Sequence, residues 1–375
     1  MTLLQVLRIL RKDGIPTYAG CAEHDFARWS RHFRPPAGNP RLSPANLAEA
    51  LPHLAFHRAV LIPCSDEWLL AVSRLPPSTT RNFPSSVPSC NVSEAMVDKS
   101  RFAELLEKAD VPRPRTRHLA TLDELQTTPE EDFHDSFLKP TVSLPFCQKY
   151  RRKGYRVSNR GQAVEIMRHV AFPILLQEFI PGPPDVSYFL EGFIDQCGEV
   201  CGMLARRRLR MFPRDLGNST LSESIELSEI RGAEQSLRKL LRMVQYRGIF
   251  NAEFKYDHRD KQFKLLEINA RPWWYVEFAA HCGVDVCLMA YRDALGLSNE
   301  PVTGYETGRR CIHRVNDLRA WWIQRRRGVT LSSWVRAWRG AEDSLIRWDD
   351  PASTVAFFAT ALQQRKRQIA RRQTA

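Results

Sequence analysis

Two carboxylates and an amide oxygen recur within a short stretch of the chain, in a pattern that suits a divalent metal ion. Glu253 lies on one strand-like segment, and Glu267 and Asn269 follow on the next, after a tight turn at 257–261. Antiparallel pairing brings Glu253 beside the face that carries the other two residues. Mg²⁺ prefers a few carboxylates together with phosphate oxygens and water. The pattern is therefore compatible with a site for Mg²⁺, or Mn²⁺, and such ions could bridge the phosphates of a nucleotide.

Alternation along the second strand decides which side chains share this face. Arg271 lies on the face of Glu267 and Asn269, because side chains of a strand point alternately to its two faces. Leu266 and Ile268 are expected on the other face. A surface hairpin with alternating polar residues has the same periodicity, so the pattern alone does not decide between a metal site and a solvated hairpin.

Three arginines follow the same alternation on an earlier strand, expected at 199–210. Arg206, Arg208 and Arg210 share one face of this strand, and Arg207 lies on the other. Three guanidinium groups on one face are costly to leave unpaired, which favours binding of an acid or a phosphate. We expect Arg208 and Arg210 to hold an acid substrate.

The segments that position these residues read as mixed α/β between about 91 and 297. Two pairs of strands are joined by tight turns, at 196–198 and 257–261, as in antiparallel hairpins. The expected strands are 136–139, 174–180, 186–195, 199–210, 248–256 and 263–268. The expected helices are 98–109, 161–169, 230–246 and 283–295. The fold class is therefore α/β overall, and α+β within this central part.

Five segments in order resemble the nucleotide-binding segments of ATP-grasp enzymes. Glu-x-Asn-x-Arg after a strand, with an acidic residue on the strand before, resembles their metal-binding end. The segments around Lys99 and Lys139 resemble those that supply two nucleotide lysines, and residues 177–182 resemble the segment that grips adenine. The basic strand with Arg208 resembles one that faces phosphates and acid substrate. The resemblance spans roughly 10–297 and is nearest to the carboxylate–amine ligase-like branch, which contains D-aspartate ligase-type proteins.

The resemblance implies ATP and Mg²⁺ (or Mn²⁺) as cofactors, bound between two lobes. Glu178 would accept from the adenine amino group, Asp185 would bind ribose, and the loop 143–154 would fold over the phosphates. Arg271 would stabilise the migrating phosphoryl group or an oxyanion. The implied nucleotide contacts are Lys99, Lys139, Gln177, Glu178, Phe179, Ile180 and Asp185, and the implied metal ligands are Glu253, Glu267 and Asn269. Taken one at a time, Lys99 and Lys139 are also explained as solvated surface charges, and residues 174–180 as an ordinary core strand.

The implied reaction joins a carboxylate to an amine. ATP activates the carboxylate as an acyl phosphate, the amine attacks, and ADP and phosphate leave. A carboligase that works through carboxyphosphate shares the same ATP site and stays an alternative. A non-catalytic nucleotide-binding protein, docked through a basic tail, is a third interpretation. The intact acidic trio and both lysines favour the ligase, whose two substrates the sequence does not identify.

Composition divides the chain into three parts: a pre-ATP-grasp α/β module at 1–90, the ATP-grasp domain at 91–297, and a basic extension at 298–375, rich in Trp and Arg. ATP-grasp proteins usually begin with a strand and a glycine turn, whereas this chain begins at an expected helix at 2–13, so that strand is apparently missing. We therefore expect an exposed sheet edge beside a strand at Ile15–Ala19. A second strand is expected in this module at 58–63.

The net charge of +13 is concentrated in the last part, since residues 301–375 carry 15 Arg and Lys against 6 Asp and Glu. A helix from Pro351 to about Arg372 is expected to pack through Val355, Phe358 and Leu362 and to end in a solvated basic stub. A weak contact with an anionic membrane and a homodimer stay open, and no DNA or RNA is required. Nine scattered cysteines, and the lack of a signal peptide or of an apolar run of about 18–20 residues, predict a cytoplasmic protein.

Overall fold

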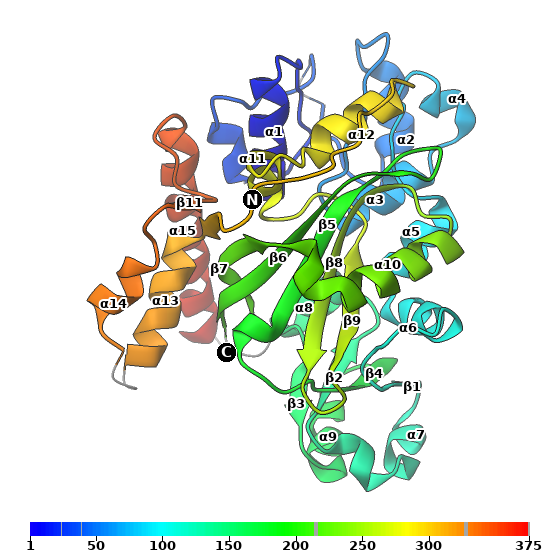
Figure 1. Cartoon of the computed structure of the whole chain (residues 1–375), viewed down its shortest axis with the longest axis vertical. Coiled ribbons are helices and arrows are strands. Elements are labelled where there is room, and N and C mark those ends of the chain that lie inside the picture. The colour runs from blue at the N-terminus through cyan, green and yellow to red at the C-terminus, as the bar shows by residue number, and fades with distance from the viewer. Residues whose placement is uncertain (24, 39, 214–216, 326–328, 374–375) are drawn as a thin grey trace.

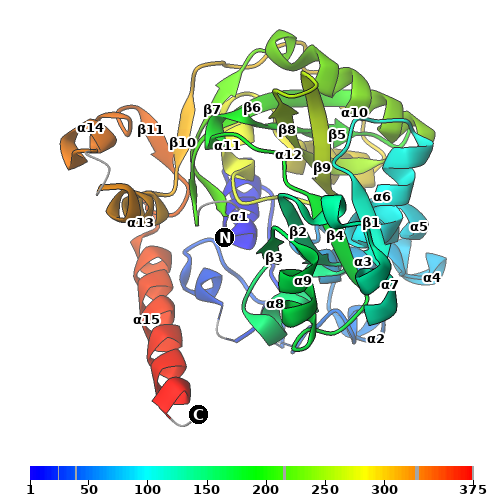
Figure 2. The same ribbon diagram turned by 90° about the horizontal axis from the view of Figure 1, so that it is seen from below.

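Two β-sheets with helices on their outer faces form the computed structural model, which describes residues 1–373 apart from 24, 39, 214–216 and 326–328 (Figures 1 and 2). The larger sheet has seven strands in the order β11-β10-β7-β6-β5-β8-β9, and the smaller has four, in the order β1-β4-β2-β3. The large-sheet strands are β5 (Ser187–Ile194), β6 (Val200–Phe212), β7 (Asn218–Ile225), β8 (Gly248–Asp257), β9 (Gln262–Asn269), β10 (Arg310–Ile312) and β11 (Ala341–Asp343). The small-sheet strands are β1 (Thr116–Leu119), β2 (Ser136–Pro140), β3 (Tyr155–Val157) and β4 (Ile174–Glu178).

Helices cover both faces of the large sheet, so side chains on both sides of its strands are buried. On one face α10 packs against the sheet together with α5 and α6, through a core that includes Leu190, Leu237 and Phe250. On the other face α1, α11 and α12 pack around Phe193 and Leu204. The helices are α1 (Thr2–Lys12), α2 (Leu47–Ala50), α3 (Asp66–Ser73), α4 (Pro77–Thr80), α5 (Cys90–Val97), α6 (Lys99–Lys108), α7 (Leu122–Thr127), α8 (Ser143–Tyr150), α9 (Arg160–Met167), α10 (Arg231–Met243), α11 (Val276–His281), α12 (Val286–Ala294), α13 (Arg314–Gln324), α14 (Leu331–Arg336) and α15 (Pro351–Gln373).

The elements expected between 91 and 297 are present within a few residues of the expected bounds, and the α/β fold class is confirmed. The sequence pattern did not indicate β1, β3 or β7, which are short or carry many polar residues. It also predicted a loop at 143–154, where the structure has helix α8, which ends at Arg151 in the left-handed conformation (φ 57°).

The N-terminal module differs from the prediction, because residues 15–19 and 58–63 are extended but form no strand in the part of the chain that is described. Ala59 and Leu61 donate their N–H groups to the carbonyls of Asn82 and Pro84, both at 2.9 Å. Pro84 has no N–H to return a bond, so no regular ladder forms. The predicted sheet edge at Ile15–Ala19 is therefore wrong as an edge of a regular sheet.

The C-terminal part adds two short strands to the large sheet and returns to the first helix. Strand β10 pairs with β7 and with β11. At the start of α15, the buried carboxylate of Asp350 accepts from Ser30 Oγ (2.7 Å), the Arg31 N–H (3.0 Å), Ser353 Oγ (2.9 Å) and Arg8 Nη2 (3.3 Å). Burial alone would raise the pKa of Asp350, but these hydrogen bonds outweigh it and lower the pKa. The network ties α15 to α1.

The predicted helix at 351–372 is confirmed, but the expected packing of its apolar face is wrong. Val355, Phe358 and Leu362 are 67%, 40% and 60% exposed, and Figure 2 shows α15 extending away from the two sheets. The helix instead packs through Phe357, which contacts the ring of Phe26 edge-on at 5.3 Å. The side chains of the expected basic stub lie outside the described residues. Among the described helices, none is both long enough and apolar enough to cross a membrane.

Replacing Asp350 by Ala should destabilise the fold strongly, because it removes the nearer of two carboxylates from the buried Arg8 and leaves only the longer contact with Glu277, at 3.7 Å, among the described residues. We expect a loss of roughly 3 kcal/mol in the free energy of unfolding at pH 7, measured by urea denaturation. Since folding lowers the pKa of Asp350, this stabilisation is present above the ordinary aspartate pKa of about 4 and is lost as the pH falls below it. The matched control is Asp349→Ala, which removes only a surface pair with Arg347 and should cost less than about 1 kcal/mol. Equal losses would contradict the role given to Asp350.

Candidate functional site

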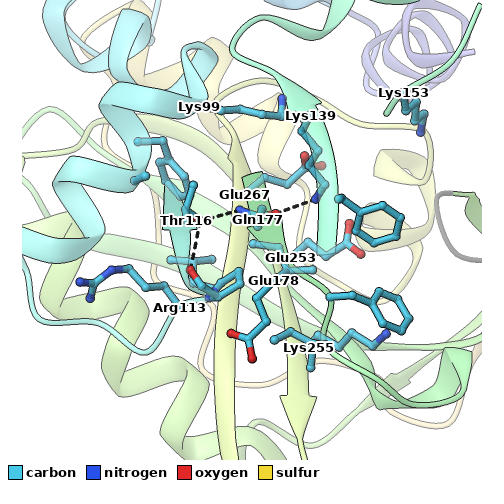
Figure 3. A pocket seen from close by; sticks show the side chains of 18 of the residues that line it. Lys99, Arg113, Thr116, Lys139, Lys153, Gln177, Glu178, Glu253, Lys255 and Glu267 are labelled. Atoms are coloured by element: carbon cyan, nitrogen blue, oxygen red, sulfur yellow. Dashed lines mark hydrogen bonds between the residues drawn. The ribbon is translucent and has the colours of Figure 1, made fainter. Parts of the chain in front are cut away.

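A cleft lies between the two sheets, lined by side chains from β2, β4, β8, β9 and α6 (Figure 3). It brings together most of the residues singled out in the sequence, although they span almost 170 positions. Of the predicted site residues, the cleft is lined by Lys99, Lys139, Gln177, Glu178, Phe179, Ile180, Arg208, Glu253 and Glu267. Asp185, Arg210, Asn269 and Arg271 lie outside this lining.

The antiparallel register of β8 and β9 places the two carboxylates opposite each other. Glu253 pairs with Glu267, and Asn251 with Asn269. A bulge shifts the register between Glu253 and Phe254, and three consecutive residues of β9, Leu265 to Glu267, line the cleft. Leu266 therefore lines the cleft beside Glu267, and the prediction that it points to the opposite face is wrong.

Lysines from two other elements surround these carboxylates. Lys99, at the start of α6, donates from Nζ to Ser143 Oγ at 2.7 Å, and Lys139, on β2, donates to Gln177 Oε1 at 2.7 Å. Burial of Glu267 by itself would raise its pKa, but the charges of Lys99, Lys153 and Lys139 outweigh burial and lower the pKa. Glu267 is therefore ionised at neutral pH.

The same environment acts in the opposite direction on Lys139. Burial in the cleft, followed by the nearby charge of Lys99, lowers the pKa of Lys139 to about 8, although Glu267 and Glu253 oppose the shift. The charge of Lys139 is thus incompletely compensated in the free protein. A phosphate group in the cleft would supply the missing negative charge.

Of the four arginines on β6, only Arg208 lines the cleft. It donates from Nη2 to Glu253 Oε1 at 2.9 Å and from Nε to Ser219 Oγ at 3.0 Å. Arg206 is fully buried against Glu191, with Nη2 and Oε1 2.5 Å apart. Of the arginines expected to face a ligand, Arg208 is therefore the one whose position in the cleft fits that expectation.

Arg210 turns away from the cleft toward the C-terminal helices. Register shifts on β6 flank Arg210, whose Nη1 donates to Asp317 Oδ2 at 2.9 Å, and the guanidinium lies 3.7 Å from the ring centre of Trp334. This pairing argues against the expected role in holding an acid. The departure from alternation is explained by the bulged register of β6 and by partners on α13 and α14 that the sequence pattern did not indicate.

Beyond the end of β9, Arg271 connects the carboxylate platform to the N-terminal module. Its Nε donates to Asp66 Oδ1 at 2.6 Å, and its Nη2 lies 3.3 Å from Asn269 Oδ1. The amide nitrogen of Asn269 lies 3.5 Å from Glu267 Oε1, which places Asn269 between the arginine and the carboxylate. Sequence reasoning missed Asp66, whose only signal was its place after Ser65 at the start of a helix.

Strand β4 supplies the wall expected to hold adenine. Gln177 bridges Lys139 and Thr116, donating to Thr116 Oγ1 at 3.0 Å. Glu178 accepts from Arg259 Nη2 at 2.6 Å and from the Arg115 N–H at 3.1 Å, so its carboxylate already has two partners. These contacts disfavour the predicted bond from adenine to the Glu178 side chain, although the apolar wall remains.

The apolar part of this wall is formed by Phe179 and Ile180. The ring of Phe179 contacts Phe137 edge-on at 5.3 Å, and Ile180 is buried. Asp185 is exposed in the short helix Pro184–Val186, apart from the residues that line the cleft. Its expected contact with ribose is therefore unsupported by the geometry.

Several cleft residues were missed by sequence reasoning. Lys255 was detectable, because alternation puts it on the face of Glu253, two residues earlier. Asn218 was not, since it begins the unpredicted strand β7; its Oδ1 accepts from Lys153 Nζ at 2.9 Å. That bond brings the end of the α8 segment across to the large sheet.

The donor set of the cleft fits a divalent ion that shares its ligands with a nucleotide. Among the described residues there is no group of three or more His, Cys, Asp and Glu side chains that could hold a metal alone. Glu253 and Glu267 could supply two hard oxygen ligands, whereas the oxygen of Asn269, expected as a third, accepts from Arg271 Nη2 at 3.3 Å. Mg²⁺ commonly takes one or two carboxylates plus substrate phosphates, so the residues present fit it.

The architecture and the cleft together are similar to those of ATP-grasp, carboxylate–amine ligase-like proteins. A D-aspartate ligase of Enterococcus faecium (strain Aus0004) is 25% identical to the chain over 227 residues. The match covers 56% of this chain and 53% of that protein, so it spans about half the length of the curated relative. No family model matches the chain.

Solved structures with the same fold cover most of the chain. The biotin carboxylase domain of 2-oxoglutarate carboxylase from Hydrogenobacter thermophilus has a TM-score of 0.63 and 17% identity, over 82% of this chain and 71% of that one. An N5-carboxyaminoimidazole ribonucleotide synthetase, solved as an ADP complex, has a TM-score of 0.63 and 13% identity, over 87% and 83%. At these identities the likeness establishes the fold alone.

The lowered pKa of Lys139 predicts that nucleotide binding weakens as the pH rises. Between pH 7 and pH 9 the lysine loses most of its charge in the free protein, so the Kd for ADP should rise roughly tenfold. Isothermal titration calorimetry in buffers of different ionisation enthalpy should show proton uptake on binding near pH 8.5. Lys139→Arg keeps the charge at all these pH values and should remove most of the dependence. An equal dependence in both proteins would contradict the assignment.

Proposed function

We propose that the chain is an ATP-dependent ligase that activates a carboxylate as an acyl phosphate for attack by an amine. The observation that carries the proposal is the pairing of Glu253 with Glu267 in a cleft that also contains Lys99 and Lys139. Ionised carboxylates among lysines suit a divalent ion bound to phosphates. Catalysis of this kind requires positioning and charge stabilisation rather than a side-chain nucleophile.

Two balanced steps describe the proposed reaction. When bound, Mg·ATP supplies the phosphoryl group: a substrate carboxylate oxygen bonds to the γ-phosphorus, the bond from that phosphorus to the bridging oxygen breaks, and ADP leaves. The amine nitrogen then bonds to the acyl carbon, the bond from that carbon to the phosphate oxygen breaks, and the nitrogen gives up a proton as phosphate leaves. Lys99 and Lys139 would stabilise the charge on the phosphates.

The arginines next to the carboxylates would place the substrate. Arg271 is held by Asp66 and adjoins Asn269, so its guanidinium is fixed just beyond the end of β9, between the hairpin and the N-terminal module. Arg208 is fixed by Glu253 and Ser219 and lines the cleft itself. We assign acid binding to Arg208 and stabilisation of the transferred group to Arg271, and we leave Arg210 out of the site.

A screen for ADP formation tests the proposal. The protein is incubated with ATP and Mg²⁺ against amino acids and small acids, each with and without an amine. ADP formation that needs both an acid and an amine supports the ligase. Turnover that needs bicarbonate with one acceptor would instead support the carboxyphosphate route. ADP formation stimulated only by nucleic acid would contradict both.

Glu267→Gln should remove turnover while leaving the fold intact, because it changes almost no volume and removes one charge at the proposed metal position. We expect ADP formation to fall by roughly a hundredfold or more, since each ~1.4 kcal/mol of lost transition-state stabilisation is about tenfold in rate. Raising Mg²⁺ or substituting Mn²⁺ should recover part of the loss. Glu165→Gln, an exposed carboxylate on α9, is the matched control and should behave as wild type. Normal turnover of Glu267→Gln, or its unfolding, would contradict the assignment.

Glu253→Gln should lower turnover to a similar degree but should also lower the melting temperature. Glu253 neutralises Arg208, whose side chain is only 7% exposed, so its loss leaves a nearly buried charge with fewer partners. Turnover of the double variant with Glu267→Gln should be little worse than that of either single variant, because the two carboxylates act as one unit. Kinetics and differential scanning fluorimetry on the three variants measure both effects. Additive losses in turnover would show that the carboxylates act separately.

A further inference from the structure

The outward side of helix α13 is apolar and basic, which reverses the usual arrangement of a helix on a protein surface. Leu318, Trp322 and Ile323 are 41%, 61% and 62% exposed. Spacings of three and four residues connect them, through the exposed Arg319, on one side of the helix. The buried side of α13 carries Asp317 instead. Proteins rarely expose large apolar side chains together unless they bind something there.

Asp317 fixes this orientation of α13. Its Oδ1 accepts from Thr220 Oγ1 at 2.7 Å, and its Oδ2 accepts from Arg210 Nη1 at 2.9 Å. The indole N–H groups of Trp334 and Trp338 also donate to Oδ2, at 2.6 Å and 2.8 Å. The carboxylate is fully buried, so the helix cannot turn its apolar side inward without breaking these hydrogen bonds and leaving a charge unpaired.

Helix α14 also exposes apolar side chains. Leu331 and Val335 are four residues apart on this helix and both are exposed, with the exposed Arg336 next to them. Figures 1 and 2 show α14 beside α13, on the side away from the large sheet. The exposed apolar side chains of the two helices form what we call the α13–α14 patch: Leu318, Trp322, Ile323, Leu331 and Val335.

The charge around this patch is strongly positive. Between residues 314 and 339 the sequence has seven arginines and one acidic residue, the buried and paired Asp317. Among these arginines, Arg319, Arg336 and Arg339 are exposed. An uncharged apolar partner would cover guanidinium groups without compensating their charge, which is costly. The partner that fits the patch is therefore anionic as well as apolar.

Two other occupants fit these observations less well. A second copy of the chain would bring two strongly positive surfaces together, and these repel. Nucleic acid supplies negative charge, and its bases stack on aromatic rings. However, the guanidinium of Arg325 lies over the ring of Trp322, 3.2 Å from the ring centre, and the other side chains of the patch are aliphatic. Acyl chains pack on aliphatic side chains, whereas bases do not stack on them.

We propose that the α13–α14 patch docks the protein on an anionic lipid surface. Trp322 and the aliphatic side chains enter the boundary between headgroups and acyl chains, where indole rings are favoured. The arginines stay at the level of the lipid phosphates, with their apolar stems alongside the patch. The membrane contact that the sequence left open is thereby assigned to α13 and α14. The patch includes no residue that lines the cleft, so docking is independent of the proposed reaction.

Co-sedimentation of the full chain with lipid vesicles tests the proposal. Vesicles of phosphatidylcholine with roughly 30% phosphatidylglycerol should bind the protein at least about tenfold more tightly than vesicles of phosphatidylcholine alone. This preference should shrink as the salt concentration rises, because salt screens the attraction between the arginines and the lipid phosphates. Equal affinity for the two kinds of vesicle, or no binding to either, would overturn the proposal.

Two double variants separate the apolar part of the contact from the charged part. Trp322→Ser with Ile323→Ser removes the two most exposed side chains of the patch, and Arg319→Gln with Arg336→Gln removes two neighbouring charges. Each pair should lower the affinity for the anionic vesicles by about tenfold or more. Trp29→Ser is the matched control, because Trp29 is 68% exposed but lies in the N-terminal module. The control should bind within about twofold of the wild type.

Unchanged binding of the Trp322→Ser, Ile323→Ser variant would show attraction by charge alone and would overturn the proposal. An equal loss in the Trp29→Ser control would do the same, because it would show that the effect does not belong to this patch. Competition with a single-stranded RNA distinguishes the remaining source of negative charge. RNA binding that is tighter than vesicle binding, and that is lost with Trp322 and Ile323, would assign the patch to nucleic acid instead.

Discussion

Two carboxylates held directly opposite each other on neighbouring strands repel, and the rest of the cleft is arranged around that repulsion. Like charges in register across a sheet are destabilising unless cations compensate them. Lys99, Lys139 and Lys153 supply that compensation on one side and Arg208 on the other. The charges of the lysines lower the pKa of Glu267 and keep it ionised. Burial and the nearby charge of Lys99 lower the pKa of Lys139 itself. A site with this balance of charges is prepared for a divalent ion and phosphate groups together.

The N-terminal module contacts this platform, and the C-terminal part is tied to the N-terminal module. Asp66 of the N-terminal module fixes Arg271 at the end of β9, and the C-terminal helix α15 is tied through Asp350 to α1. Helix α1 in turn packs against the large sheet. The N-terminal module is therefore held at two places: by Arg271 after the β8–β9 hairpin, and by Asp350 of the C-terminal part.

The sequence predicted the β8–β9 hairpin and its carboxylates because alternation and a tight turn are local properties. It did not predict the bulge that turns Leu266 into the cleft, since a bulge depends on how Phe254 pairs across the sheet. The placement of Arg210 failed for a related reason: its partners Asp317 and Trp334 lie more than a hundred residues away. In the N-terminal module the apolar runs were recognised, but the partner segment ends at Pro84, which cannot complete a ladder. Local pattern thus predicted the platform, and non-local pairing decided which charges face it.

The central claim, that a carboxylate is activated by phosphoryl transfer, is tested most directly by oxygen-18 labelling. The acid that supports ADP formation is labelled in both carboxylate oxygens, and the phosphate released during a complete turnover is analysed by mass spectrometry. The proposed mechanism predicts one labelled oxygen in each phosphate, because the carboxylate oxygen bonded to phosphorus leaves with it. Phosphate that carries no label, formed at the same rate as ADP, would show that ATP is hydrolysed without activating the acid and would contradict the account.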